Sequence, residues 1–214
     1  MTGPGLAQPE PMETRPPRVS VPRLSREETQ RRAERAFDAS MQAVLRSHFR
    51  PPPAAEVTAF RNMVNARLRQ TREGETLDIG AVLEDYCRAN PSSAIARYNR
   101  LFGGDTSWLM SGDRIAFNSA AFNTLARNYV SAARQPTVNA LVQLNDPRNR
   151  TVPVPITSLE SDIVAALQTS LSGQLRSGSN QLPATVAFER QEERLMFASL
   201  LPPPDQNVDF SRKG

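Results

Sequence analysis

Two arginines, Arg148 and Arg150, have the type and spacing best suited to a chemical task in this chain. They follow Pro147, which lacks a backbone N–H and therefore ends a helix. Two residues of extended chain span about 6.6 Å, close to the spacing of adjacent phosphates on a stretched strand. Because the planar guanidinium group matches phosphate geometry, the two side chains can hold successive phosphates without reading a base. A solvated turn would show the same pattern, so the flanking sequence has to decide.

The residues before this turn predict the helix that holds it in place. Over 135–144 the apolar side chains fall on one helical face, which we expect to pack against a core. The helix would end at Pro147 and leave Asp146 and the two arginines in the turn. The expected core-facing residues are Val138, Leu141, Val142 and Leu144.

Other chemical sites are not evident in the sequence. His48 is the only histidine and Cys87 the only cysteine, which argues against a zinc site, an iron–sulfur site or a disulfide framework. We expect His48 at the surface or an interface, and Cys87 packed as a small apolar residue. Neither a P-loop nor a dinucleotide fingerprint occurs. We therefore expect no enzymatic activity and no cofactor.

The charged residues point to a polyanionic partner. Lys213 is the only lysine, so the other 25 of the 26 basic residues are arginine, and the net charge is +4. Arginine suits phosphate and carboxylate partners, although GC-rich coding produces the same bias. Charges are mixed along most of the chain, but over 110–151 five arginines face only Asp113 and Asp146, and we expect RNA there. These arginines are Arg114, Arg127, Arg134, Arg148 and Arg150.

Several amphipathic helices must position this turn. A capping box at Ser25 and Glu28 opens the first, which Pro51 to Pro53 end, and a second runs to about Gly74. Asp78 and then Ser92 or Ser93 cap two short helices, and another leads to Pro136. A capping box at Thr157 and Glu160 opens the last. The expected buried stripes are Ala33, Phe37, Met41, Leu45 and Phe49; Val57, Phe60, Val64 and Leu68; Ile79, Val82, Leu83, Tyr86 and Cys87; Ile95, Tyr98, Leu101 and Phe102; Phe122, Leu125, Tyr129 and Ala133; and Leu159, Ile163, Leu167, Leu171 and Leu175.

These elements predict an all-α fold, an antiparallel four-helix bundle with minor strand content. The Pro-rich residues 1–24 and the residues 200–214 would be disordered tails. Residues 25–74 would form an extra helical extension, and residues 75–199 the bundle. No apolar run is long enough to span a membrane, and the N-terminus lacks a signal-peptide layout, so we expect a soluble intracellular protein.

The order of the motifs resembles the coat proteins of rod-shaped plant RNA viruses, the tobamovirus-like family. In that family a pattern of Pro, Val, Ala-Leu and Asp-x-Arg-Asn-Arg has the same ungapped spacing as here. The resemblance covers roughly Gly74 to Ser199. It is carried by Pro136, Val138, Ala140, Leu141 and Asp146 to Arg150; by Asp78-Ile79, Leu83 and Cys87; by Ala96-Arg97, Phe102, Trp108 and Arg114 to Phe117; by Asp162 to Ala166; and by Phe188-Glu189, Leu195, Phe197 and Ser199.

This resemblance implies a virus coat protein that self-assembles into a helical rod and packages single-stranded RNA. Arg148, Arg150 and then Arg97 would contact phosphates, with Asn149 in the same turn. Asp146 would orient the arginines or pair across a subunit boundary. The partners would be RNA and identical subunits, without a membrane, in the virion and in the host cytoplasm before assembly.

The N-terminal extension has no counterpart in the family. We expect it to decorate the particle, so that a chain starting near Glu75 still folds. We also expect Phe188, Leu195 and Phe197 to close the bundle and pack between neighbouring subunits.

Two other functions remain open at this point. One is the coat protein of a flexible filamentous plant virus, although that group's aromatic-Asp-Phe signature is not found. The other is a cellular helical scaffold or regulatory protein that binds acidic partners through its Arg-rich N-terminal half.

Overall fold

The computed structural model describes residues 24–146, 148–149, 151–154, 159–177, 186–191 and 194–199, and from residue 151 onward it describes side chains only for Val152 and 159–175. The protein is mostly helical, as predicted, and the described residues also form short strands. The helices are α1 Arg26–His48, α2 Ala54–Gln70, α3 Ile79–Ala89, α4 Ala94–Leu101, α5 Ser119–Ser131, α6 Arg134–Leu144 and α7 Ser161–Ser177, with a 3-10 turn at Ser107–Leu109.

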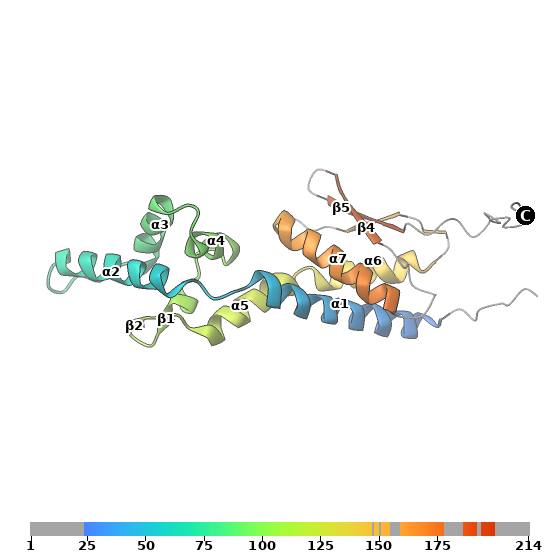
Figure 1. The fold of residues 1–214 in the computed structure, drawn as a ribbon, viewed down its shortest axis with the longest axis horizontal. Helices are drawn as coiled ribbons and strands as arrows, with labels where there is room; N and C mark the ends of the chain where they lie inside the picture. Colours follow the sequence, from blue (N-terminus) through green and yellow to red (C-terminus); the bar gives the residue numbers. More distant parts are fainter. Residues whose placement is uncertain are drawn as a thin grey trace, which may run out of the picture.

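The molecule is elongated and has two halves along its length (Figure 1). One half, called the inner half below, holds α2, α3 and α4 with a small hairpin. The other, the outer half, holds α1, α6 and α7 with a three-stranded sheet. The halves meet at a junction formed by residues 49–53, and α5 crosses from one half to the other. The four helices expected to form one bundle are therefore divided between the two halves.

Local sequence signals account for where the helices begin. Ser25 accepts a hydrogen bond from the N–H of Glu28 at 3.1 Å, and Asp78 accepts one from the N–H of Gly80 at 2.9 Å. Ser93 accepts one from the N–H of Ala96 at 3.1 Å. Each bond satisfies an orphan donor of the first turn. The start of α7 differs from prediction, because the helix begins at Ser161, and Thr157 lies outside the described residues.

Helix α1 is the long element of the outer half. It runs towards the junction, whereas α6 and α7 run away from it, so α1 is antiparallel to both (Figure 1). Phe37 is fully buried, but Met41 and Leu45 of the predicted stripe are only half-buried. A spacing of four residues drifts by about 40° per step around a helix of 3.6 residues per turn, so Ser40 and Val44 take the buried positions instead.

Helix α1 packs against α6 and α7 in the core, whereas the sequence suggested that residues 25–74 form an extension outside the bundle. Phe37 and Val44 belong to the same buried cluster as Leu141 of α6 and Leu167 of α7. Pro51 to Pro53 do end α1, as predicted, but they form a junction and not a boundary between a core and an appendage. The prolines show where α1 ends, but the sequence does not show which other helices pack against it. For this reason the segment suggested a separate extension.

Helices α5 and α6 follow each other almost in line and lead from the inner half to the turn that contains Arg148, called the Arg turn below. The break falls at Ala132 and Ala133, just before Pro136, which lies in the first turn of α6 where no N–H is needed. On α6, Val138 and Leu141 are fully buried, as predicted. On α7, the predicted stripe is confirmed in full, with Ile163, Leu167 and Leu171 at 0% exposure.

The inner half has a smaller core. Phe60 of α2 packs edge-on against Tyr86 of α3, and Val64 is also buried. Leu68 was predicted to be in the same stripe but is 56% exposed, since the end of α2 extends beyond α3 (Figure 1). Gly103 and Gly104 close α4 with positive φ, a conformation that suits glycine.

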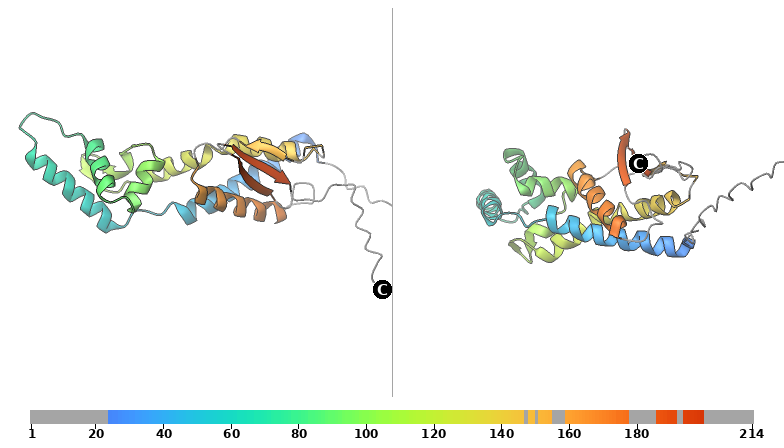
Figure 2. Two further views of the ribbon diagram at one scale, coloured as in Figure 1. Left: turned by 90° about the horizontal axis from the view of Figure 1, so that it is seen from above. Right: turned by 45° about the vertical axis from the view of Figure 1, so that its right-hand side comes forward.

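The strands form two small antiparallel sheets. β1 (Met110–Ser111) pairs with β2 (Arg114–Ile115). The second sheet has the order β3-β5-β4 and comprises β3 (Thr151–Val154), β4 (Val186–Gln191) and β5 (Arg194–Ser199). It lies against α6 and α7 (Figure 2). The predicted extended conformation at 195–197 is confirmed, and the side chains of Phe188, Leu195 and Phe197 lie outside the described residues.

Candidate nucleic-acid interface

The turn after α6 is closed by its own backbone. Leu144 is the last buried residue of the helix, and the N–H of Asp146 donates to the carbonyl of Gln143 at 3.0 Å. The N–H of Asn149 then donates to the carbonyl of Asp146 at 2.9 Å. Asn149 also donates its side-chain Nδ2 to the Gln143 carbonyl at 3.2 Å. Two of these hydrogen bonds tie the turn to Gln143 of α6, and the third closes the turn on itself.

Asp146 orients Arg148, one of the two roles predicted for it. Its Oδ1 accepts the backbone N–H of Arg148 at 3.0 Å and Nε at 3.1 Å, while Oδ2 accepts Nη2 at 2.7 Å. The hydrogen bond and then the charge of Asp146 raise the pKa of the Arg148 guanidinium above its ordinary value. Arg148 thus remains a cation held in one direction.

The Arg148 guanidinium can still bind a ligand while it is paired. Its side chain is 87% exposed, whereas that of Asp146 is 32% exposed. A guanidinium has five N–H donors in a fixed fork, and the bonds to Asp146 use Nε and one hydrogen of Nη2. The other three donors are left for an oxygen ligand. Pro147 and Arg150 lie outside the described residues, so the predicted pair of arginines is described only at Arg148.

A groove of about 570 Å³ opens beside this turn, between the end of α6 and the start of α1. The side-chain Nδ2 of Asn145 donates a hydrogen bond to Thr29 Oγ1 at 3.2 Å, and this bond joins the two helices that line the groove. The groove is lined by Leu24, Arg26, Thr29, Val142, Gln143, Asn145, Asp146, Arg148 and Asn149. Sequence analysis missed the contribution of α1, because Arg26 is separated from the turn by most of the chain.

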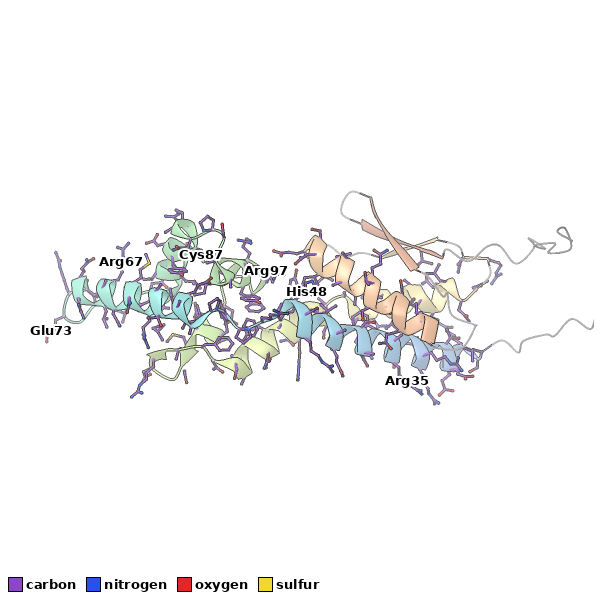
Figure 3. The ribbon with its side chains drawn as sticks, viewed as in Figure 1. Arg35, His48, Arg67, Glu73, Cys87 and Arg97 are labelled. Atoms are coloured by element: carbon purple, nitrogen blue, oxygen red, sulfur yellow. The ribbon has the colours of Figure 1, made fainter. Side chains whose placement is uncertain are left out.

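Arg97, the third predicted phosphate contact, does not line this groove. It lies at the junction, close to His48 (Figure 3). Its Nη2 donates to Asp162 at 2.7 Å, its Nη1 donates to the carbonyl of His48 at 3.3 Å, and Glu160 lies 3.6 Å from its Nε. These contacts were not evident from the sequence, because the position of an arginine on a helix does not reveal which carboxylates the fold brings to it. Arg97 instead joins α4 to the start of α7 and the end of α1.

We expect Arg97→Ala to lower stability and to leave RNA binding unchanged. The variant removes a hydrogen-bonded ion pair whose arginine side chain is only 28% exposed, and a loss of about 1–2 kcal/mol is reasonable for such a group. Urea unfolding followed by circular dichroism measures the effect. Arg100→Ala, an exposed arginine on the same helix, is the matched control. A weaker affinity for RNA with unchanged stability would return Arg97 to the binding site.

The other arginines of the predicted basic region do not form one cluster. Arg134 donates its Nε to Asp38 of α1 at 3.2 Å, and this hydrogen bond raises the pKa of its guanidinium. Arg114 lies on β2 in the inner half, and Arg127 is exposed on α5. Among the arginines of this region that the structure describes, Arg148 is the one that lines the groove.

The aromatic residues of the region around Trp108 belong to the core. Trp108 and Phe122 are buried, and both pack against Tyr98. Phe117 and Tyr129 are partly buried against the same cluster. Base stacking on these rings is therefore not the basis of the site. Cys87 is half-buried, and burial raises the pKa of its thiol.

Comparison of the chain with protein-family models, with curated proteins and with solved structures finds no match in any of the three. The resemblance to the tobamovirus-like coat proteins therefore remains a prediction that rests on the motifs themselves. Among the described residues, no helix is long and apolar enough to cross a membrane. The same part of the chain holds no group of three His, Cys, Asp or Glu residues that could bind a metal ion.

Proposed function

We propose that this chain is the coat protein of a rod-shaped RNA virus, a subunit that polymerises into a helical rod around single-stranded RNA. The observation that carries the proposal is Arg148, which is 87% exposed and held by Asp146 at the end of a buried helix. A fixed, exposed guanidinium can contact phosphates, which every nucleotide of a genome offers. Arg150 is the second proposed contact.

The shape of the molecule is compatible with such a subunit. Its length follows the helix axes, and the Arg turn lies at the end of α6 that is farthest from the junction (Figure 1). We propose that α1, α6 and α7, with α5 continuing α6, form the helical bundle of the subunit. This differs from the sequence prediction of a four-helix bundle within residues 75–199, because α1 belongs to the bundle and α3 and α4 lie in the other half. The protein would occur in the virion, and in the host cytoplasm before assembly.

Asp146 gives the proposed contact a second property. Because its carboxylate neutralises the Arg148 guanidinium, the phosphate has to share the arginine with an internal anion. Each contact is then weaker than that of an unpaired arginine, but a rod multiplies it over many subunits. This arrangement favours binding by an assembled array over binding by a single subunit.

We expect Asp146→Asn to strengthen RNA binding several-fold. An asparagine can still accept the backbone N–H of Arg148, so the turn is kept while the competing charge is lost. The slope of log affinity against log salt should change little, because Arg148 contacts one phosphate with or without the carboxylate. Fluorescence anisotropy with a labelled single-stranded RNA over a salt series measures both. Asp113→Asn, an exposed carboxylate of the inner half, is the control, and weaker binding by Asp146→Asn would contradict this role.

The whole proposal is tested on purified full-length protein. Nuclease protection of co-purifying RNA, followed by electron microscopy, should reveal protected RNA inside straight rods. Sinuous filaments would instead favour a flexible filamentous virus, and protein that carries no RNA and does not polymerise with added RNA would favour a cellular scaffold. Either of the last two results would overturn the proposal.

A further inference from the structure

We propose that the groove between the start of α1 and the end of α6 binds one nucleotide, with its base inside the groove and its flanking phosphates on Arg26 and Arg148. This inference deepens the proposed function and rests on it, because it adds a base-binding part and a second cation to the Arg148 contact. It also gives the N-terminal helix a direct role in RNA binding.

The groove is built in advance and does not have to be formed by the ligand. Thr29 is 1% exposed, and its hydroxyl donates to the carbonyl of Ser25 at 3.0 Å. The same hydroxyl accepts the bond from Asn145 at 3.2 Å, so the first turn of α1 is joined to the last turn of α6. Both walls are therefore held in place, and a ligand loses little affinity to ordering the protein.

The size and lining of the groove suit a nucleotide. Its volume of about 570 Å³ lies within the range of roughly 300–1,000 Å³ that small-ligand sites occupy. Leu24 and Val142 offer apolar contact for the faces of a base, and the amide side chains offer partners for its edge. The two arginines lie in the same groove, where they can contact the negatively charged backbone.

The charges on α1 favour Arg26 as the second cation. Arg31 pairs with Glu27 and Arg32 pairs with Glu28, each one helical turn apart. Arg26 lines the groove, is exposed, and forms no ion pair with any residue that the structure describes. Arg35 is also exposed but does not line the groove, which makes it a matched control on the same helix (Figure 3).

The amide groups predict which bases are preferred. Asn145 and Asn149 each use a side-chain N–H within the protein, so their carbonyl oxygens remain as acceptors. Acceptors favour bases that carry an exocyclic amino group, such as cytosine and adenine, over uracil, which has none. A preference for cytosine over uracil of about 2- to 10-fold would correspond to one neutral hydrogen bond.

The experiment uses the full chain and short labelled oligonucleotides of cytidine or uridine, which differ little in stacking. Arg26→Ala should weaken binding of both and flatten the salt dependence by about 0.7, whereas Arg35→Ala should leave the affinity near that of the wild type. Asn149→Ala, at an exposed position, should remove the preference for cytidine. The thermal midpoint of each variant, measured alongside, identifies any that is misfolded.

The possible failures are distinguishable. Equal effects of Arg26→Ala and Arg35→Ala, or equal affinity of the wild type for cytidine and uridine, would overturn the nucleotide site. The proposed function would then still stand if binding depends on Arg148. Absence of any RNA binding by the wild type would remove the proposed function and this inference together.

Discussion

Replacing both Arg148 and Arg150 by alanine is expected to lower the affinity for RNA strongly while leaving the fold intact. Two charge-assisted contacts contribute about 3 kcal/mol or more, which corresponds to roughly a 100-fold loss of affinity. The slope of log affinity against log salt should flatten by about 1.4, since each phosphate contact on a single strand contributes about 0.7. Stability should not change, because the Arg148 side chain is 87% exposed and pairs only with the carboxylate two residues before it in the described structure.

A charge-matched control separates a specific site from general electrostatic attraction. Arg67 and Arg88 both pair with Asp85 in the inner half, and their side chains are 50% and 77% exposed. The double alanine variant of these two residues removes the same charge from the other half of the molecule (Figure 3 labels Arg67). Equal loss of binding by the two double variants would show that RNA is attracted by net charge and not held at the turn.

The second large effect is expected from Phe37→Ala, which should destabilise the whole outer half. Phe37 is fully buried in the cluster shared by α1, α6 and α7. Truncating a buried phenylalanine costs about 3–5 kcal/mol, a large part of the stability of a typical domain. Denaturant unfolding measures the loss, and Arg35→Ala at an exposed site of the same helix serves as control.

The same packing predicts the fate of a truncated chain. A protein that begins at Glu75 lacks α1 and would expose the apolar faces of α6 and α7, including Leu141 and Leu167. We expect it to be insoluble or unfolded. A soluble, cooperatively folding protein of this length, together with an unchanged midpoint for Phe37→Ala, would restore the view that the N-terminal helices are an appendage.

Features encoded within a few residues were predictable from the sequence. The caps at Ser25, Asp78 and Ser93 depend on a side chain and a backbone N–H two or three residues away. The buried stripe of α7 follows from the helical repeat, and the helix break before Pro136 follows from proline chemistry. The contact between Asp146 and Arg148 is equally local, and the family resemblance implied that Asp146 orients the arginines or pairs across a subunit boundary.

Features that join distant segments were not predictable in this way. An amphipathic stripe on α1 requires a partner but does not specify α6 or α7. Arg97 has the same residue type as Arg148, and only the fold places Asp162 and Glu160 beside it. The groove needs Arg26 and Arg148 together, and no local pattern links them. Likewise, alternation predicted strand conformation near Leu195 but not its pairing with Val154.

The antiparallel arrangement of α1 with α6 and α7 has a consequence for synthesis. Helix α1 leaves the ribosome early, but its buried face has no cover until α6 and α7 have followed, and such long-range contacts form late in folding. The hydrogen bond from Asn145 to Thr29 joins two residues that are 116 positions apart in the sequence. A nascent chain that ends before Asn149 therefore has no complete groove, so under the proposed function an unfinished chain would not compete with finished ones for RNA.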